Sequence, residues 1–173
     1  MASKKHASVV VIGAGPGGYA AAFRSADLGK DVLLIDREPA LGGVCLNRGC
    51  IPSKALLHIA RVMEEARSLN AMGVEFGSPE INIDSIREWK EKVIIQLNQG
   101  IAQMAKARKV ETLQGTAAFK SNSELLVSAG SKKTTVSFDH CIIAAGSVSA
   151  SAPGISMDHP DILTSRTALD LEK

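Results

Sequence analysis

The segment SVVVIGAGPGGYAAAFRSADLGKDVLLID, residues 8–36, decides the fold of this chain. Residues 8–12 form a short β-branched apolar run, which is typical of a strand buried on both faces. Residues 16–28 are rich in alanine and are followed by Gly29, so they predict a helix with a glycine just past its end. Residues 32–35 predict a second buried strand. A strand, a helix and a strand within about thirty residues form a βαβ unit, which favours a parallel, right-handed arrangement.

The turn between the first strand and the helix reads GAGPGG over residues 13–18, a match to G-x-G-x-x-G. Gly13 permits the tight turn, Gly15 lets the backbone approach a pyrophosphate, and Gly18 allows close packing of helix on strand. The anion then lies on N–H groups at the positive end of the helix dipole. Asp36 closes the second strand about twenty residues further on, where an acid binds ribose hydroxyls.

Together these features predict a dinucleotide site, against the alternative of a glycine turn that merely joins strand to helix. An acid at position 36 fits FAD or NAD better than a 2′-phosphorylated cofactor. The glycine motif does not choose between FAD and NAD.

Two long helical patterns follow an irregular, Gly- and Cys-rich stretch at residues 41–52. On the first helix Leu56, Ile59, Ala60 and Met63 share a face. The second helix is predicted to open with Asp84 as its N-cap. Its apolar stripe consists of Ile86, Trp89, Val93, Leu97, Ile101 and Met104.

From Val110 the hydrophobic period changes to that of strands. Residues 110–115, 116–120, 125–128 and 134–138 predict short antiparallel strands separated by polar turns. Residues 140–145 are apolar and predict a buried strand that rejoins the parallel sheet, and residues 147–173 are poorly patterned. The expected fold is therefore α/β: a Rossmann-like, doubly wound parallel sheet with an antiparallel β-meander and two long helices, of the FAD/NAD(P)-binding type.

Composition limits the classes of function. The 173 residues are 45% hydrophobic and 22% charged, and the formal net charge is +2. Basic residues are scattered among acids, which argues against binding to nucleic acid or to a membrane surface. No apolar run approaches the length of a membrane span, and the polar N-terminus leaves no room for a secretory signal. We expect a soluble cytoplasmic protein.

Cys45 and Cys50 stand five residues apart in the segment GGVCLNRGCIPSK, residues 42–54. In a regular helix such a pair lies about 7.5 Å apart along the axis, whereas a disulfide needs Cα atoms roughly 4.4–6.8 Å apart. The backbone must therefore distort for the two to bond, and Gly49 can supply that freedom. A zinc site is the weaker alternative, because no second cysteine or histidine pair stands at ligand spacing. Two buried thiols without a redox role are the other alternative.

This cysteine segment resembles the redox motif of the flavoprotein disulfide reductases that bind two dinucleotides. Its sequence, C-L-N-x-G-C-I-P-S-K-A-L-L, is most similar to that of the dihydrolipoamide dehydrogenases within this family. The likeness continues through residues 9–28, the two long helices, the meander and the stretch IIAAGS at residues 142–147. The resemblance implies oxidation of dihydrolipoamide through a redox disulfide and FAD, with NAD as co-substrate. It also implies a homodimer that serves the lipoyl groups of 2-oxo acid dehydrogenase complexes.

The resemblance also implies roles for single residues. Cys45 would be the thiol that exchanges with substrate, Cys50 would lie against the flavin, and Lys54 would stand beside the flavin N5 region. Asp36 would hold the adenosine ribose, and Ala117 the adenine through its backbone. The implied cofactor-binding set is Gly13, Gly15, Pro16, Gly17, Gly18, Asp36, Arg37, Gly42, Gly43, Val44, Cys45, Cys50, Lys54, Ala117, Ala145 and Gly146, and no metal site is implied.

Residues 1–147 would form the FAD-binding domain, and residues 148–173 a linker toward an NAD-binding domain that this chain lacks. In this family the base is a histidine of the other subunit, so His6, His58, His140 and His159 are not expected to act. The fragment alone is therefore expected to be inactive. Arg48 and Val148 depart from the family pattern. The rivals are another flavoprotein disulfide reductase, of glutathione or mercuric reductase type, and a non-catalytic FAD-domain module.

Overall fold

The computed structural model describes residues 3–157, 159 and 161–172. The chain divides into two compact units. The sheet unit comprises residues 1–45 and 97–148, and the helical unit comprises residues 46–96 and 149–173. The division falls between Cys45 and the residue that follows it.

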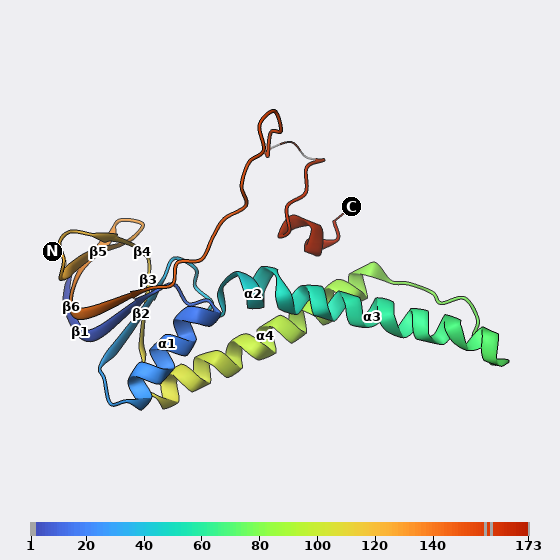
Figure 1. Ribbon diagram of the computed structural model, residues 1–173, viewed down its shortest axis with the longest axis horizontal. Helices are drawn as coiled ribbons and strands as arrows, with labels where there is room; N and C mark the ends of the chain where they lie inside the picture. The colour runs from blue at the N-terminus through green and yellow to red at the C-terminus, as the bar shows by residue number, and fades with distance from the viewer. Residues whose placement is uncertain (1–2, 158, 160, 173) are drawn as a thin grey trace. The chain divides into compact units, whose positions relative to one another are not determined.

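Within the described residues, the sheet unit holds one six-stranded sheet in the order β3-β2-β1-β6-β5-β4 (Figure 1). Strand β1 pairs in parallel with β2 and β6, and β2 pairs in parallel with β3. Strands β4, β5 and β6 pair antiparallel. The predicted α/β class with an antiparallel meander is confirmed. The strands are β1 (Ser3–Ile12), β2 (Val32–Asp36), β3 (Glu111–Gln114), β4 (Thr116–Phe119), β5 (Glu124–Ala129) and β6 (Lys132–Ile143).

Two strand predictions are wrong. The segment at residues 110–115 was expected in the antiparallel meander, but β3 runs parallel to β2, with Leu33 opposite Glu111. The reason is the long helical connection before it, because a crossover of this kind returns the chain in the same direction. The strands expected at residues 134–138 and 140–145 are one strand, β6, that ends at Ile143. Asp139, which separated the two predicted strands, stays in the strand with an exposed side chain. The segment at residues 140–145 was also expected to be buried, but Ile142 and Ile143 are 37% and 67% exposed.

Helix α1 (Pro16–Asp27) contacts β1 and β2 and buries Ala22 and Phe23. Gly29, with φ of 78°, follows its end and donates its N–H to the carbonyl of Ala26 at 2.9 Å, as the glycine stop predicted. The remaining helical segments are α2 (Gly43–Arg48), α3 (Cys50–Ser68), η1 (Leu69–Met72), α4 (Ile83–Ala107) and η2 (Thr167–Asp170).

Helix α4 differs from its prediction in two ways. Its N-terminus is capped by Asn82, whose side-chain oxygen accepts the N–H of Ser85 at 2.9 Å, and not by Asp84. Trp89 and Leu97 of the predicted stripe are 40% and 41% exposed. Met104 is 42% exposed, whereas Ile101 is buried as predicted, together with Lys90, Ile94 and Ala105, which the stripe did not include. Positions 90, 94, 101 and 105 still lie along one face of the helix, beside the predicted stripe, and a hydropathy pattern cannot place a lysine at a buried position.

The core of the sheet unit joins β1 and β2 to the meander. Val10, Leu33 and Ile35 pack with residues of β5 and β6 in one apolar cluster. At the edge of this cluster the Phe119 ring meets the Phe138 ring edge-on, with centroids 6.3 Å apart. Both predicted buried strands of the βαβ unit are confirmed, because β2 is buried along Val32–Ile35 and Val10 and Val11 are fully buried. No helix in the described part of the chain is long and apolar enough to span a membrane.

Candidate dinucleotide and redox site

The loop between β1 and α1 is held in place by backbone contacts. Gly13 has φ of 100° and donates its N–H to the carbonyl of Ile35 at 2.7 Å. A Cβ on Gly18 would lie 1.6 Å from the carbonyl oxygen of Gly13, so only glycine fits there. This confirms the predicted tight turn and the close packing of helix on strand. The first turn of α1 contains no acidic residue and receives no side-chain cap, which leaves its N–H groups available to an anion.

The glycines of the cysteine segment rest on this loop. Gly42 donates its N–H to the carbonyl of Ala14 at 2.8 Å. Gly43 has φ of 59°, and a Cβ on it would lie 2.5 Å from the Cα of Gly15. The loop at residues 13–18 and the glycines at 42 and 43, which are separated in the sequence, therefore form one backbone surface in the sheet unit.

Asp36 links the loop to the end of β2. One carboxylate oxygen accepts the N–H of Ala14 at 2.6 Å, and the other accepts the N–H of Glu38 at 2.8 Å. Each carboxylate oxygen can accept a second hydrogen bond. The acid is therefore oriented by the backbone, and it keeps acceptor capacity for a further hydrogen bond.

A cavity of about 190 Å³ opens beside Asp36, at the carboxyl ends of β1 and β2. This edge is where parallel α/β sheets bind their ligands. Five predicted residues line it: Gly13, Asp36, Arg37, Ala117 and Ala145. Four further residues line it that were not predicted from the sequence: Ile12, Ile35, Gly115 and Thr116. Gly115 had a signal, since a glycine between two strand patterns marks a close backbone approach, and its N–H donates to the carbonyl of Asp36 at 2.7 Å.

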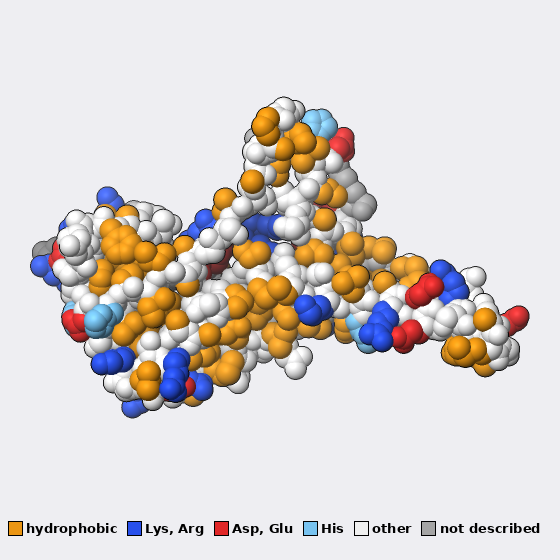
Figure 2. Space-filling model, viewed as in Figure 1, with side chains coloured by type: hydrophobic (Ala, Val, Ile, Leu, Met, Phe, Trp, Pro, Cys, Tyr) orange, Lys and Arg blue, Asp and Glu red, His pale blue; other side chains and the backbone are white. Residues whose placement is uncertain are grey.

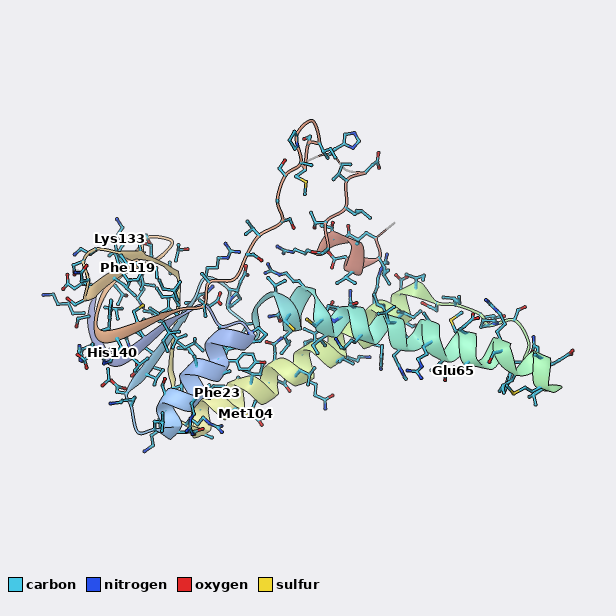
Figure 3. All side chains as sticks on the ribbon, in the orientation of Figure 1. Phe23, Glu65, Met104, Phe119, Lys133 and His140 are labelled. Atoms are coloured by element: carbon cyan, nitrogen blue, oxygen red, sulfur yellow. The ribbon has the colours of Figure 1, made fainter. Side chains whose placement is uncertain are left out.

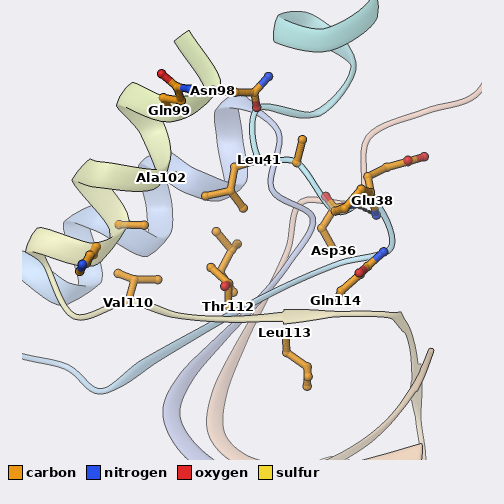
Figure 4. Close-up of a pocket in the computed structure, with 15 residues that line it drawn as sticks. Asp36, Glu38, Leu41, Asn98, Gln99, Ala102, Val110, Thr112, Leu113 and Gln114 are labelled. Carbon is orange, nitrogen blue, oxygen red and sulfur yellow. Dashed lines mark hydrogen bonds between the residues drawn. The ribbon is translucent and has the colours of Figure 1, made fainter. Parts of the chain in front are cut away.

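A larger cavity of about 470 Å³ lies between the C-terminal half of α4 and β2–β3, and no sequence feature predicted it. Its floor is apolar, and Glu38 and Gln114 stand at its polar side (Figure 4). Figure 4 shows Leu113 on the other side of β3 from Val110 and Thr112. Asp36, the last residue of β2, lines both cavities.

The cysteine segment contains a helix break. Helix α2 ends at Arg48 and α3 begins at Cys50, while Gly49 has φ of −145° and ψ of −105°, which is neither helical nor extended. The backbone therefore departs from a regular helix at the glycine that the sequence indicated. Cys45 is half-buried, and Cys50 is exposed at the first position of α3. Cys50 and Cys141 are free thiols in the structure, so a disulfide between Cys45 and Cys50 stays a prediction.

The other predicted residues are placed as follows. Lys54 is exposed and, four residues after Cys50, lies on the same side of α3. Val44, Pro16, Gly17 and Gly146 are exposed, the last just past the end of β6. Their cofactor contacts, like the roles of Gly15 and Gly43, stay predictions.

The residues that were not expected to act, or that depart from the family pattern, are placed as follows. All of the histidines are exposed, among them His140 on β6 (Figure 3). Cys141 packs against the apolar cluster, and burial raises the pKa of its thiol. Arg48 is half-buried, and Val148 is 77% exposed.

Comparison with protein families and curated proteins gives a consistent result. The family model described as "Pyridine nucleotide-disulphide oxidoreductase" matches residues 7–173. The chain is 51% identical to the dihydrolipoyl dehydrogenase of Vibrio cholerae and 48% identical to that of Haemophilus influenzae, in each case over all of this chain and 36% of the relative. It is 42% identical to dihydrolipoyl dehydrogenase 2 of Haloarcula marismortui over 95% of this chain. The chain thus spans about a third of the length of these relatives.

A solved structure shares the fold. The HOCl-induced flavoprotein disulfide reductase RclA from Escherichia coli superposes with a TM-score of 0.78, covering 96% of this chain and 34% of that one. At 23% sequence identity the likeness concerns the fold alone.

Proposed function

Because this chain belongs to the pyridine nucleotide-disulphide oxidoreductase family, we propose that it is the FAD-binding, disulfide-bearing part of a dihydrolipoyl dehydrogenase. The observation that carries the proposal is the cavity beside Asp36, which gathers five residues predicted to bind the cofactor. The relatives that match along the whole chain carry the name of this enzyme. The activity of the whole protein is part of the proposal, since this chain spans only a third of them.

The residues present fit an adenosine and a pyrophosphate. The first turn of α1 has uncapped N–H groups for the phosphates, and the glycines at 15 and 43 leave only backbone on the surface beside it. Asp36 would accept hydrogen bonds from the ribose hydroxyls through the lone pairs that Ala14 and Glu38 do not use. The backbone of Ala117, in the wall of the same cavity, would contact the adenine.

Cys45 and Cys50, in their disulfide form, would act as the oxidant of the substrate dithiol. A thiolate of dihydrolipoamide attacks the Sγ of Cys45 and displaces the thiolate of Cys50, which the N-terminus of α3 favours as an anion. The second substrate thiol then displaces Cys45, so lipoamide leaves as a cyclic disulfide and both cysteines are reduced. When bound, FAD would supply the two-electron acceptor that returns the cysteine pair to its disulfide form, with NAD⁺ as the final acceptor.

Partners and location belong to the same proposal. Lipoyl groups of 2-oxo acid dehydrogenase complexes would deliver the substrate dithiol, in the cytoplasm, to a homodimer. Exposed apolar side chains of the helical unit support a protein partner, among them Leu57, Met72 and Phe76. Figure 2 shows hydrophobic surface, in orange, on the visible face of the helices.

The cofactor half is tested by titrating the purified chain with FAD and following the visible flavin band and the quenching of flavin fluorescence. We expect Asp36→Ala to weaken binding by about tenfold or more, because a hydrogen bond to a charged group contributes about 1.5–3 kcal/mol. Asp31→Ala, an exposed acid before the same strand, should bind as the wild type does. Equal affinity of both variants would remove Asp36 from the site.

The redox part of the proposal is tested in the whole protein that contains this chain. Cys45→Ser should abolish lipoamide-dependent reduction of NAD⁺ while the flavin band remains, because the FAD contacts come mainly from the glycine loop and Asp36. Turnover at the wild-type rate by a flavin-replete Cys45→Ser enzyme would contradict the exchange role.

A further inference from the structure

We propose that Arg87 and Lys90 form a carbonyl clamp, a set of hydrogen bonds that holds the C-terminal segment (residues 161–172) on the first turns of α4. All of these residues belong to the helical unit. The clamp lies outside the predicted redox and cofactor residues, and it docks residues 161–172 on this unit.

The clamp consists of hydrogen bonds from two cations to consecutive backbone carbonyls. The Nζ of Lys90 donates to the carbonyl of Leu169 at 2.7 Å. The guanidinium of Arg87 donates through Nε to the carbonyl of Asp170 at 3.2 Å and through another nitrogen to that of Leu171. These carbonyls stand at the C-terminal end of η2, where the backbone dipoles favour a cation.

The two cations stand where α4 itself favours negative charge, and Arg87 is compensated there by an ion pair with Asp84 at 2.7 Å. Both lie in the N-terminal third of α4, whose own dipole disfavours positive charge there. The Lys90 side chain is only 4% exposed, and a lysine is almost never buried without partners. Its remaining partner is the carboxylate of Glu91 at 3.5 Å. The carbonyl of Leu169 therefore supplies a partner for a buried ammonium group that the helix alone does not explain.

The segment carries internal structure that presents these carbonyls. The hydroxyl of Thr167 accepts the N–H of Thr164 at 2.9 Å, and the hydroxyl of Thr164 accepts the N–H of Thr167 at 3.3 Å. This reciprocal pair closes the turn that leads into η2. The turn orders one end of η2 and the clamp holds the other, so both ends of η2 are fixed within the helical unit.

The clamp is tested by the accessibility of Lys90 to acetylation. Intact chain and a chain ending at residue 160 are treated with an amine-reactive acetyl ester, and each lysine is quantified by mass spectrometry. Lys92 is the internal reference, because it lies on the same helix with a side chain 76% exposed. In the intact chain we expect Lys90 to react at least about tenfold more slowly than Lys92, and in the shortened chain at a rate within about threefold of it. Rapid acetylation of Lys90 in the intact chain, or persistent protection in the shortened one, would overturn the clamp.

A second measurement does not depend on truncation. Lys90→Met keeps the aliphatic stem, Arg87→Gln leaves α4 a good helix former, and Lys92→Met is the matched control. In each variant amide hydrogen exchange is followed at Ala168 and Leu169, whose N–H groups donate to carbonyls of the turn. We expect exchange to accelerate about tenfold in the first two variants and to stay unchanged in the third, with the amides of β1 and β2 equally protected in all three. Equal amide exchange rates at Ala168 and Leu169 in all variants, or loss of amide protection throughout the chain, would refute the clamp.

Discussion

The glycine loop at residues 13–18 and the cysteine segment at residues 42–54 contact each other, yet the properties that determine their residues differ. In the loop the determinant is the absence of a side chain, because a Cβ on Gly18 would overlap the carbonyl oxygen of Gly13. In the cysteine segment the glycines determine only where the backbone rests, and the chemistry depends on side chains placed across a helix break at Gly49. A steric requirement is settled by local geometry, whereas a reactive pair also depends on redox state and on what surrounds it.

The largest expected effect lies in the loop. Gly18→Ala should lower the free energy of unfolding by roughly 3 kcal/mol or more, because the added Cβ meets a backbone oxygen that cannot move aside. Gly17→Ala is the matched control: its Cβ would meet nothing within 4 Å. That variant should change stability by less than about 1 kcal/mol, in the stabilising direction expected for alanine in a helix. Urea unfolding followed by circular dichroism measures both, and similar midpoints would show that the loop relaxes more easily than the contacts suggest.

A smaller effect is expected where the two motifs meet. Gly43→Ala should cost about 2–3 kcal/mol, because it combines a positive φ with a contact of 2.5 Å to the Cα of Gly15. Gly29→Ala has a comparable φ of 78° and no neighbour within 4 Å, so it should cost only about 1 kcal/mol. The difference between the two isolates the contact. If both variants lose the same stability, the packing of Gly43 on the loop contributes nothing.

The smallest expected effect on stability concerns the cysteines. Near neutral pH iodoacetamide should label Cys50 faster than Cys141, because Cys50 is exposed and burial raises the pKa of the Cys141 thiol. The folded state holds that proton to higher pH than the unfolded state does. The stability linked to Cys141 is therefore complete below the ordinary thiol pKa and is lost as pH rises through the raised value. Mass spectrometry of labelled peptides against time and pH checks both, and faster labelling of Cys141 at neutral pH would show that β6 opens.

The predictions from sequence succeeded where a single local rule applies. The strand at residues 32–35, the glycine turn and the stop at Gly29 follow from hydrophobic runs and from glycine geometry, and the structure confirms all three. They failed where two rules compete. Asn82 and Asp84 are both acceptable caps, and only the backbone entering α4 decides in favour of Asn82.

The sequence by itself determined the βαβ unit, the glycine loop with Asp36 at the end of β2, and the helix break between the cysteines. These features rest on backbone conformations and hydrophobic periods that neighbouring residues impose on one another. Only the tertiary structure decided that β3 lies parallel to β2, that Gly115 and Thr116 complete the cavity with Asp36, and that Lys90 is buried. Each of these depends on groups distant in the chain, and the partner that makes a buried ammonium or a ligand cavity favourable cannot be read from the residue itself.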